Sequence, residues 1–181
     1  HVHLTATGLQ LIGLDLSAAT SRDQCLRVIA DHIAANPNQP VWGHGWDDSV
    51  WPAGQTLTTA DIDAVAGLKP AYLSRVDVHS AVASTALRNR VSGLSAVAGF
   101  DPHRPLSAQA HHLVRTEARR LLTARQRADA RRSALDAAAA AGIVAVHECA
   151  GPEIGGIEDW NELRGTHHGV EVVGYWGEAV S

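Results

Sequence analysis

The amino-acid sequence predicts an α/β fold with a mainly parallel sheet. Segments typical of strands alternate along the chain with segments typical of helices. One expected strand, residues 143–147, is a continuous apolar run of the kind found in strands that are covered on both faces. A length of 181 residues is enough for one domain with a substantial core and short for two. The content of 45% hydrophobic and 19% charged residues is ordinary for a globular protein. We therefore expect residues 1–181 to form a single domain.

The individual elements follow from the spacing of apolar residues and from the residues that end each segment. Ser21 or Thr20 can cap a helix whose apolar residues recur at helical spacing, and the Asn- and Pro-rich residues 36–40 end it. Gly67 and Gly142 close two later helices. We expect strands at residues 1–7, 41–46, 71–78, 143–147 and 170–175, and helices at residues 21–35, 58–65, 80–90, 107–122, 123–141 and 157–164.

Two histidines flank a β-branched residue at the start of the first expected strand. Side chains two residues apart lie on the same face of a strand, so His1 and His3 can converge on one point. Two neutral imidazoles are a good half-site for a divalent metal ion. A pair of solvated histidines at a frayed end of the chain explains the same residues equally well.

Polar and ionisable residues gather at the carboxyl ends of the other expected strands. They are His44, Trp46, Asp47 and Asp48, then Arg75, Asp77 and His79, then His147 and Glu148, and finally Trp176 and Glu178. Parallel α/β folds present their ligands and catalytic groups at these strand ends. Each residue has a structural explanation by itself: a solvated turn for the acidic pair, a buried histidine for His147. Their recurrence at one end of five strands predicts a functional face.

Composition and motifs narrow the classes of function. A net charge of −4 argues against nucleic acid and anionic membranes as partners, and no apolar run reaches the roughly 18 residues of a membrane span. Cys25 and Cys149 form no disulfide framework, which favours a cytoplasmic location. The sequence holds no phosphate-binding glycine motif and no nucleophile elbow. Because the chain lacks methionine, we expect it to be a processed chain or a segment.

Four segments, in their order along the chain, resemble amidohydrolase family 3, a branch of the metal-dependent amidohydrolases that are built on a TIM barrel. They are His1-Val2-His3-Leu4, Trp42-Gly43-His44-Gly45-Trp46-Asp47 with Trp51-Pro52, Arg75-Val76-Asp77-Val78-His79-Ser80, and Gly142-Ile143-Val144-Ala145-Val146-His147-Glu148. The resemblance implies a partial (β/α)8 TIM-type barrel with a segment inserted after the first strand. It also implies that His1 and His3 bind a divalent metal, expected to be zinc as one or two ions.

For the substrate, the resemblance and the strand-end positions together predict contacts from Asp77, His79, Trp46, His147 and Glu148. The implied reaction is hydrolysis of a C–N bond in a small amide-like molecule by metal-activated water. The resemblance also implies that the general acid or base and the remaining metal ligands lie beyond residue 181. The only lysine, Lys69, lies in a turn and does not match the bridging lysine of the family. We expect this chain alone to be inactive and, because sheet edges are unpaired, either to form a homo-oligomer or to depend on segments outside it.

Two other classes of function fit the residues. One is a stand-alone α/β domain that binds a small molecule, with Trp42, Trp46 and Trp51 lining an apolar pocket. The other is a regulatory domain without catalytic activity. A metal titration separates the first of these from the hydrolase, because a binding domain of that kind needs no ion.

Overall fold

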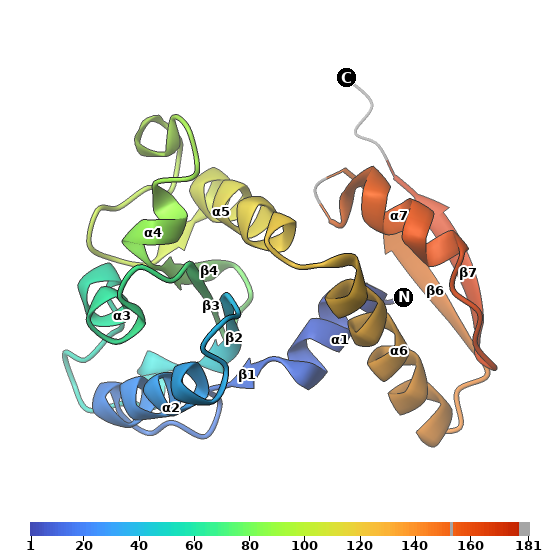
Figure 1. The fold of residues 1–181 in the computed structure, drawn as a ribbon, viewed down its shortest axis with the longest axis horizontal. Helices are drawn as coiled ribbons and strands as arrows, with labels where there is room; N and C mark the ends of the chain where they lie inside the picture. Colours follow the sequence, from blue (N-terminus) through green and yellow to red (C-terminus); the bar gives the residue numbers. More distant parts are fainter. Residues whose placement is uncertain (153, 178–181) are drawn as a thin grey trace. The chain divides into compact units, whose positions relative to one another are not determined.

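A computed structural model of the chain describes residues 1–152 and 154–177 (Figure 1). The chain divides into two compact units. One consists of His1–Ile12 together with Leu122–Ser181, and the other is Gly13–Leu121. Both contain helices and strands, so the predicted α/β class is confirmed.

The Gly13–Leu121 unit contains a five-stranded sheet in which the strands follow one another in sequence order. The strands are β1 (Leu14–Asp15), β2 (Val41–Trp46), β3 (Ala71–Arg75), β4 (Ser80–Ala83) and β5 (Leu106–Ser107). β1, β2 and β3 pair in parallel, whereas β3 pairs with β4, and β4 with β5, in antiparallel fashion. The expectation of a mainly parallel sheet is therefore wrong for β4 and β5, which pair in antiparallel fashion.

Both faces of this sheet are covered. The helices of the unit are α2 (Arg22–Ala35), α3 (Thr59–Ala66), α4 (Thr85–Arg88) and α5 (Ala108–Arg120). Leu73 and Val82 join the core with α2 and α3, while their strand neighbours Tyr72 and Ala83 join the core with α4 and α5. This division follows from the alternation of side chains along a strand. The predicted cap at Ser21 is confirmed. The structure also shows a cap for α3 at Thr58, which forms a reciprocal capping box with Asp61.

The helix expected at residues 80–90 is wrong over its first half. Residues 80–83 form β4, and only the single turn of α4 follows, capped by the Ser84 hydroxyl, which accepts the Leu87 N–H. Ala81, Val82 and Ala83 are completely buried and pair with β3. Burial in the sheet outweighs the helical preference of this alanine-containing segment.

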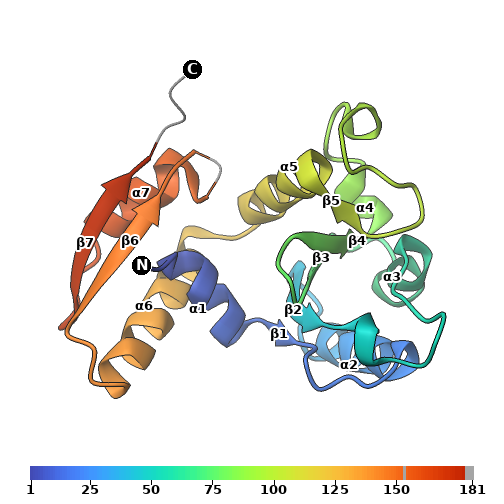
Figure 2. The same cartoon turned by 180° about the vertical axis from the view of Figure 1, so that it is seen from behind.

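The other unit packs three helices against two strands and the start of the chain (Figures 1 and 2). Its elements are α1 (Leu4–Ile12), α6 (Ala124–Ala140), β6 (Ala145–Ala150), α7 (Gly156–Arg164) and β7 (Glu171–Trp176). β6 and β7 pair in parallel, and Val2 forms an isolated parallel bridge to Glu148 on the other edge of β6. The parallel order is therefore Val2, β6, β7, which is also their order along the chain.

The strand expected at residues 1–7 is reduced to that bridge, because Leu4 begins a helix. Glu148 accepts the Leu4 N–H at 2.6 Å, so a carboxylate lies at the amino end of α1, where the helix dipole favours negative charge. Further along, α1 packs closely along α6. Within residues 1–152 and 154–177, no helix combines the length and apolar character needed to cross a membrane.

Candidate metal and substrate site

The backbone of Val2 fixes the direction of both neighbouring histidines. The Val2 N–H donates to His147 O at 2.8 Å, and the Cys149 N–H donates to Val2 O at 3.1 Å. The Val2 side chain packs against the apolar core of its unit, together with Val146 and Leu4. Since side chains alternate along an extended segment, His1 and His3 lie on the opposite face of this sheet.

His1 and His3 lie side by side on that face. Their ring centroids are 5.3 Å apart, and the rings meet edge to face at 74°. The His3 side chain is 38% exposed, yet its Nδ1 atom is buried and makes no hydrogen bond. Two adjacent imidazoles fit two positions in the coordination shell of a zinc-like ion. Within the described residues no group of three or more histidine, cysteine or acidic side chains could hold a metal ion.

Glu148 projects to the core side of β6 and lies beneath the first turn of α1. Its side chain is nearly buried, with 5% of the residue exposed. One carboxylate oxygen accepts the Leu4 N–H, and the other lies 3.8 Å from His3 Nδ1. Burial raises the pKa of this carboxyl, although the Leu4 N–H and the His3 ring act in the opposite direction. The site thus pairs a half-exposed imidazole with a buried carboxylate.

His147 is on the same face as His1 and His3, and it is exposed rather than buried. Its Nδ1 shares a hydrogen bond of 3.0 Å with the Tyr175 hydroxyl, and the two rings stack with centroids 5.6 Å apart. The register that pairs His147 with Val173 and Cys149 with Tyr175 brings β7 into this face. Sequence reasoning missed Tyr175, because the register between two strands cannot be read from either strand alone.

The acidic and basic residues of the second and third strand ends form one cluster in the Gly13–Leu121 unit. Arg75 donates from Nε to Asp48 at 2.9 Å and from its two terminal nitrogens to Asp77 at 2.9 Å and Asp47 at 3.4 Å. The guanidinium also lies 5.8 Å from the centroid of Trp46. Through these contacts Arg75 links the end of β3 to the segment Trp46-Asp47-Asp48 at the end of β2, which gives the two strand ends a shared structural role.

Asp77 is held by donors from its own turn. Its carboxylate accepts the backbone N–H groups of His79 and Ser80 at 2.9 and 3.2 Å. Burial acts to raise the pKa of this carboxyl, but the His79 N–H and the Arg75 guanidinium outweigh it, so the pKa is below its usual value. Val78, which lies between Asp77 and His79, has a left-handed φ of 56°, which a β-branched residue rarely adopts.

The predicted substrate residues therefore fall into two groups. His147 and Glu148 lie near His1 and His3 in one unit. As successive residues of β6, His147 and Glu148 point to opposite faces of that strand. Trp46, Asp77 and His79 lie in the other unit. Trp46 is completely buried and its indole N–H donates to Leu73 O at 3.0 Å, whereas the His79 side chain is exposed. A substrate role for these five residues stays a prediction, and Glu178 lies outside the described residues.

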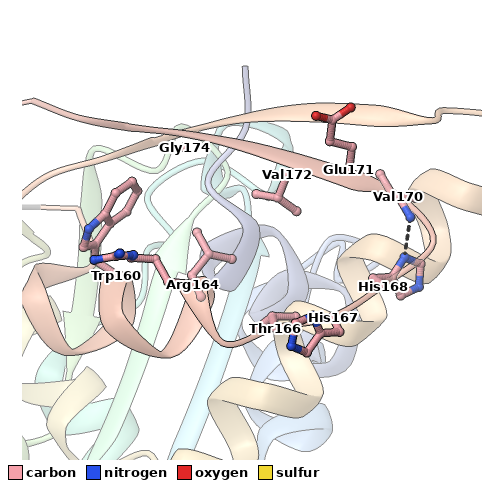
Figure 3. Close-up of a pocket in the computed structure, with 10 residues that line it drawn as sticks. Trp160, Arg164, Thr166, His167, His168, Val170, Glu171, Val172 and Gly174 are labelled. Carbon is pink, nitrogen blue, oxygen red and sulfur yellow. Dashed lines mark hydrogen bonds between the residues drawn. The ribbon is translucent and has the colours of Figure 1, made fainter.

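A pocket of about 380 Å³ lies between α7 and β7 (Figure 3). It is lined by Trp160, Leu163, Arg164, Thr166, His167, His168, Val170, Glu171, Val172 and Gly174. Both His168 ring nitrogens are engaged, Nδ1 accepting the Val170 N–H at 3.0 Å and Nε2 lying 2.9 Å from an Asp136 oxygen. Val172 and Gly174 alternate with Tyr175 along β7, so the pocket is on the face opposite His1 and His3.

Comparison with known proteins shows which family this arrangement belongs to. A model of the Amidohydrolase family matches residues 1–175, and the chain belongs to that family. The resemblance of the four sequence segments is thereby confirmed. Two solved structures, both titled as uncharacterized metal-dependent hydrolases, share the fold over 97% of this chain. The one from Pyrococcus furiosus has a TM-score of 0.73 at 22% identity, and the one from Pyrococcus horikoshii OT3 has 0.71 at 19%.

Curated relatives match shorter stretches. The protein LONG AFTER FAR-RED 3 of Arabidopsis thaliana is 29% identical over 96 residues, which are 52% of this chain and 16% of that protein. The putative amidohydrolase YtcJ of Bacillus subtilis (strain 168) is 34% identical over 90 residues, which are 49% of this chain and 17% of that protein. In the two solved structures the match covers 36% and 35% of the longer chain. The chain is thus much shorter than these relatives.

Proposed function

We propose that this chain is the N-terminal part of the catalytic domain of a metal-dependent hydrolase that cleaves a C–N bond in a small amide-like molecule. The observation that carries the proposal is the His1–His3 pair, whose rings lie 5.3 Å apart on one face of a parallel strand arrangement. In this proposal His1 and His3 are two ligands of one or two zinc ions. Membership of the amidohydrolase family and the likeness to two metal-dependent hydrolases support it.

The strand order supports a partial (β/α)8 barrel. Val2, β6 and β7 are parallel neighbours in sequence order, and α7 connects β6 to β7, as expected of successive barrel strands. The Gly13–Leu121 unit lies in the chain between α1 and α6 of the other unit. It corresponds to the segment that we expected after the first strand. In this proposal residues 1–181 are one part of a single catalytic domain.

A bound zinc ion would supply a Lewis acid that lowers the pKa of a water molecule from ~15.7 towards ~7. The residues of this chain would hold the ion through the two imidazoles and present His147 and Tyr175 on the same face. Asp77, His79, Trp46, His147 and Glu148 are proposed to contact or shape the substrate site. The chain holds no assigned general acid or base, and by itself it is proposed to be inactive.

The alternative of a stand-alone binding domain is less well supported. Two of the three tryptophans expected to line its pocket, Trp46 and Trp51, are buried in the core of the Gly13–Leu121 unit. Each indole N–H donates to a backbone carbonyl, Trp46 to Leu73 and Trp51 to Ala19. Indole rings that are packed in the core and hydrogen-bonded to the backbone in this way do not line an open ligand pocket. Cytoplasmic location and self-association stay predictions.

The test is the metal content and amide-hydrolase activity of the full-length gene product, compared with the double variant His1→Ala/His3→Ala. The proposal expects about one or two zinc ions per chain in the wild type and loss of both metal and turnover in the variant. The double variant His103→Ala/His167→Ala, at two exposed histidines, is the matched control and should keep both. A metal-free wild type whose activity survives the His1/His3 changes would overturn the proposal.

A further inference from the structure

Glu148 has two carboxylate oxygens with different neighbours, and only one of them is used by the helix. Oε2 accepts the Leu4 N–H at 2.6 Å, which anchors the carboxylate at the start of α1. The other oxygen, Oε1, lies 3.8 Å from Nδ1 of His3, the residue that precedes Leu4. Because the first oxygen is anchored, the position of the second relative to the His3 ring is also constrained.

His3 Nδ1 needs a partner that Glu148 is placed to provide. The atom is buried and makes no hydrogen bond, and leaving a buried polar atom unpaired costs about 1–3 kcal/mol. At 3.8 Å the contact with Glu148 is longer than a hydrogen bond, which requires about 2.7–3.2 Å. A rotation of the half-exposed imidazole that shortened this contact would pair Nδ1 with the buried carboxylate.

The direction of that hydrogen bond determines the tautomer of His3. An ionised carboxylate can only accept, so the bond requires the proton on Nδ1 and leaves the lone pair on Nε2, at the far side of the ring. Histidines that bind metal ions generally donate their other ring N–H to a carboxylate, a carbonyl or water. We propose that Glu148 is a positioning residue that holds His3 in the Nδ1–H tautomer and directs Nε2 towards the metal, an inference that rests on the proposed function.

The bridge between Val2 and β6 explains why one residue serves both the helix and the histidine. Val2 pairs with Glu148 itself, so the carboxylate rises beside the residues that directly follow Val2, namely His3 and Leu4. The N–H of Leu4 and the ring of His3 are therefore within reach of a single side chain. A change at Glu148 that preserves acceptance from Leu4 separates the two roles.

Glu148→Gln is that change. Its amide oxygen can still accept the Leu4 N–H, while its NH2 group would face His3 Nδ1 as a donor and favour the opposite tautomer. The measurement is long-range ¹H–¹⁵N correlation NMR of the metal-free full-length gene product labelled at histidine, with His3 assigned from a His3→Gln spectrum. We expect the Nδ1–H form to predominate in the wild type and the Nε2–H form in Glu148→Gln. We also expect zinc affinity to fall by about 10–100-fold in a calorimetric titration with Zn²⁺ alone.

Asp136→Asn is the matched control, because Asp136 is the carboxylate partner of another histidine, His168. It should alter the His168 signals and leave both the His3 tautomer and the zinc affinity unchanged. A predominant Nε2–H form of His3 in the wild type overturns the inference without any variant, and so does an unchanged tautomer in a folded Glu148→Gln protein. If instead the tautomer responds as expected but zinc binding does not depend on His3, the proposed metal site fails while the Glu148–His3 contact stands.

Discussion

Gly8 of α1 lies directly against the backbone of Ala130 in α6. A Cβ atom placed on Gly8 would be 1.8 Å from the Ala130 carbonyl oxygen, so no side chain can be accommodated there without separating the two helices. Glycine at this position allows α1, which carries His1 and His3 at its amino end, to pack closely on the long helix α6. The candidate metal ligands are thus positioned in part by a residue that has no side chain.

Gly8→Ala should destabilise the protein, although intrinsic helix propensity alone favours alanine by about 1 kcal/mol. We expect the free energy of unfolding to fall by about 3 kcal/mol, because the methyl group would overlap rigid backbone atoms. Urea denaturation measures this change. Gly169→Ala is the control, since nothing lies within 4 Å of the corresponding Cβ position, and it should change stability by no more than about 0.5 kcal/mol. An unchanged or increased stability of Gly8→Ala would show that the two helices do not approach so closely.

Arg131→Ala should be among the most destabilising removals of a charged side chain in the same unit. Arg131 is 3% exposed and donates to Asp159 at 2.7 Å and to Glu162 at 2.9 Å, which ties α6 to α7. Removing it leaves two carboxylates with less compensation, and we expect a loss of about 3 kcal/mol in the free energy of unfolding.

The matched comparison for that change is Arg125→Ala, on the same helix. The Arg125 side chain is 90% exposed and lies 3.7 Å from Asp129, so its removal should cost less than about 1 kcal/mol. Equal losses for the two arginine variants would contradict the buried role of Arg131. The comparison is made by chemical denaturation at one salt concentration, because exposed ion pairs are screened by salt.

Val78→Gly should stabilise the Gly13–Leu121 unit. The left-handed φ of 56° costs a β-branched residue about 1–2 kcal/mol, which glycine avoids. The greater conformational freedom of glycine in the unfolded chain lowers stability by about 0.4–1 kcal/mol. We expect a net gain of about 1 kcal/mol. Val76→Gly, at a nearby exposed valine whose φ is not positive, should instead lower stability. If both variants are destabilised, the strain at Val78 is not present in solution.

Stability should fall as the pH is lowered from about 6.5 to about 4, because His111 is buried as a neutral imidazole. His111 shares a hydrogen bond of 2.8 Å with Tyr72, and burial lowers its pKa to about 4. In the unfolded chain the group has its ordinary pKa near 6.5, so the unfolded state binds the proton first and gains over the folded state as the pH falls. The shift corresponds to at most about 3 kcal/mol.

The check is the free energy of unfolding at pH 7.5, 5.5 and 4.5 in the wild type and in His111→Gln. The variant should be less stable at pH 7.5 but should show a weaker dependence on pH over this range. His103→Gln, at an exposed histidine of the same unit, should retain the wild-type pH dependence. An identical slope in wild type and His111→Gln would assign the pH dependence to other groups.

Local signals in the sequence predicted much of the secondary structure. The cap at Ser21 and the apolar strand around Val146 were predicted from residues within a few positions of each element. The errors fall where distant residues decide. Leu4 begins a helix because a carboxylate 144 residues away accepts its N–H, and Ser80–Ala83 is a strand because β3 is available to pair with it.

The candidate site shows the same division. The face shared by His1 and His3 could be predicted from alternation along an extended segment. Alternation also separates His147 from Glu148. Only the pairing of Val2 with Glu148 reveals that Glu148 lies near His3, and only the register between β6 and β7 reveals that Tyr175 joins His147. The Arg75 cluster was equally hidden, because its four partners come from two strand ends and the sequence does not show that these meet.

The division of one unit into two stretches of chain, His1–Ile12 and Leu122–Ser181, has a consequence for how the protein folds during synthesis. The whole Gly13–Leu121 unit is translated after α1 and before α6, so α1 is synthesised well ahead of the helix along which it packs. The Gly13–Leu121 unit can fold on its own contacts meanwhile, whereas Val2 reaches its place only after β6 has been translated. The segment that carries His1 and His3 therefore reaches its final position late, after the unit that follows it in the chain.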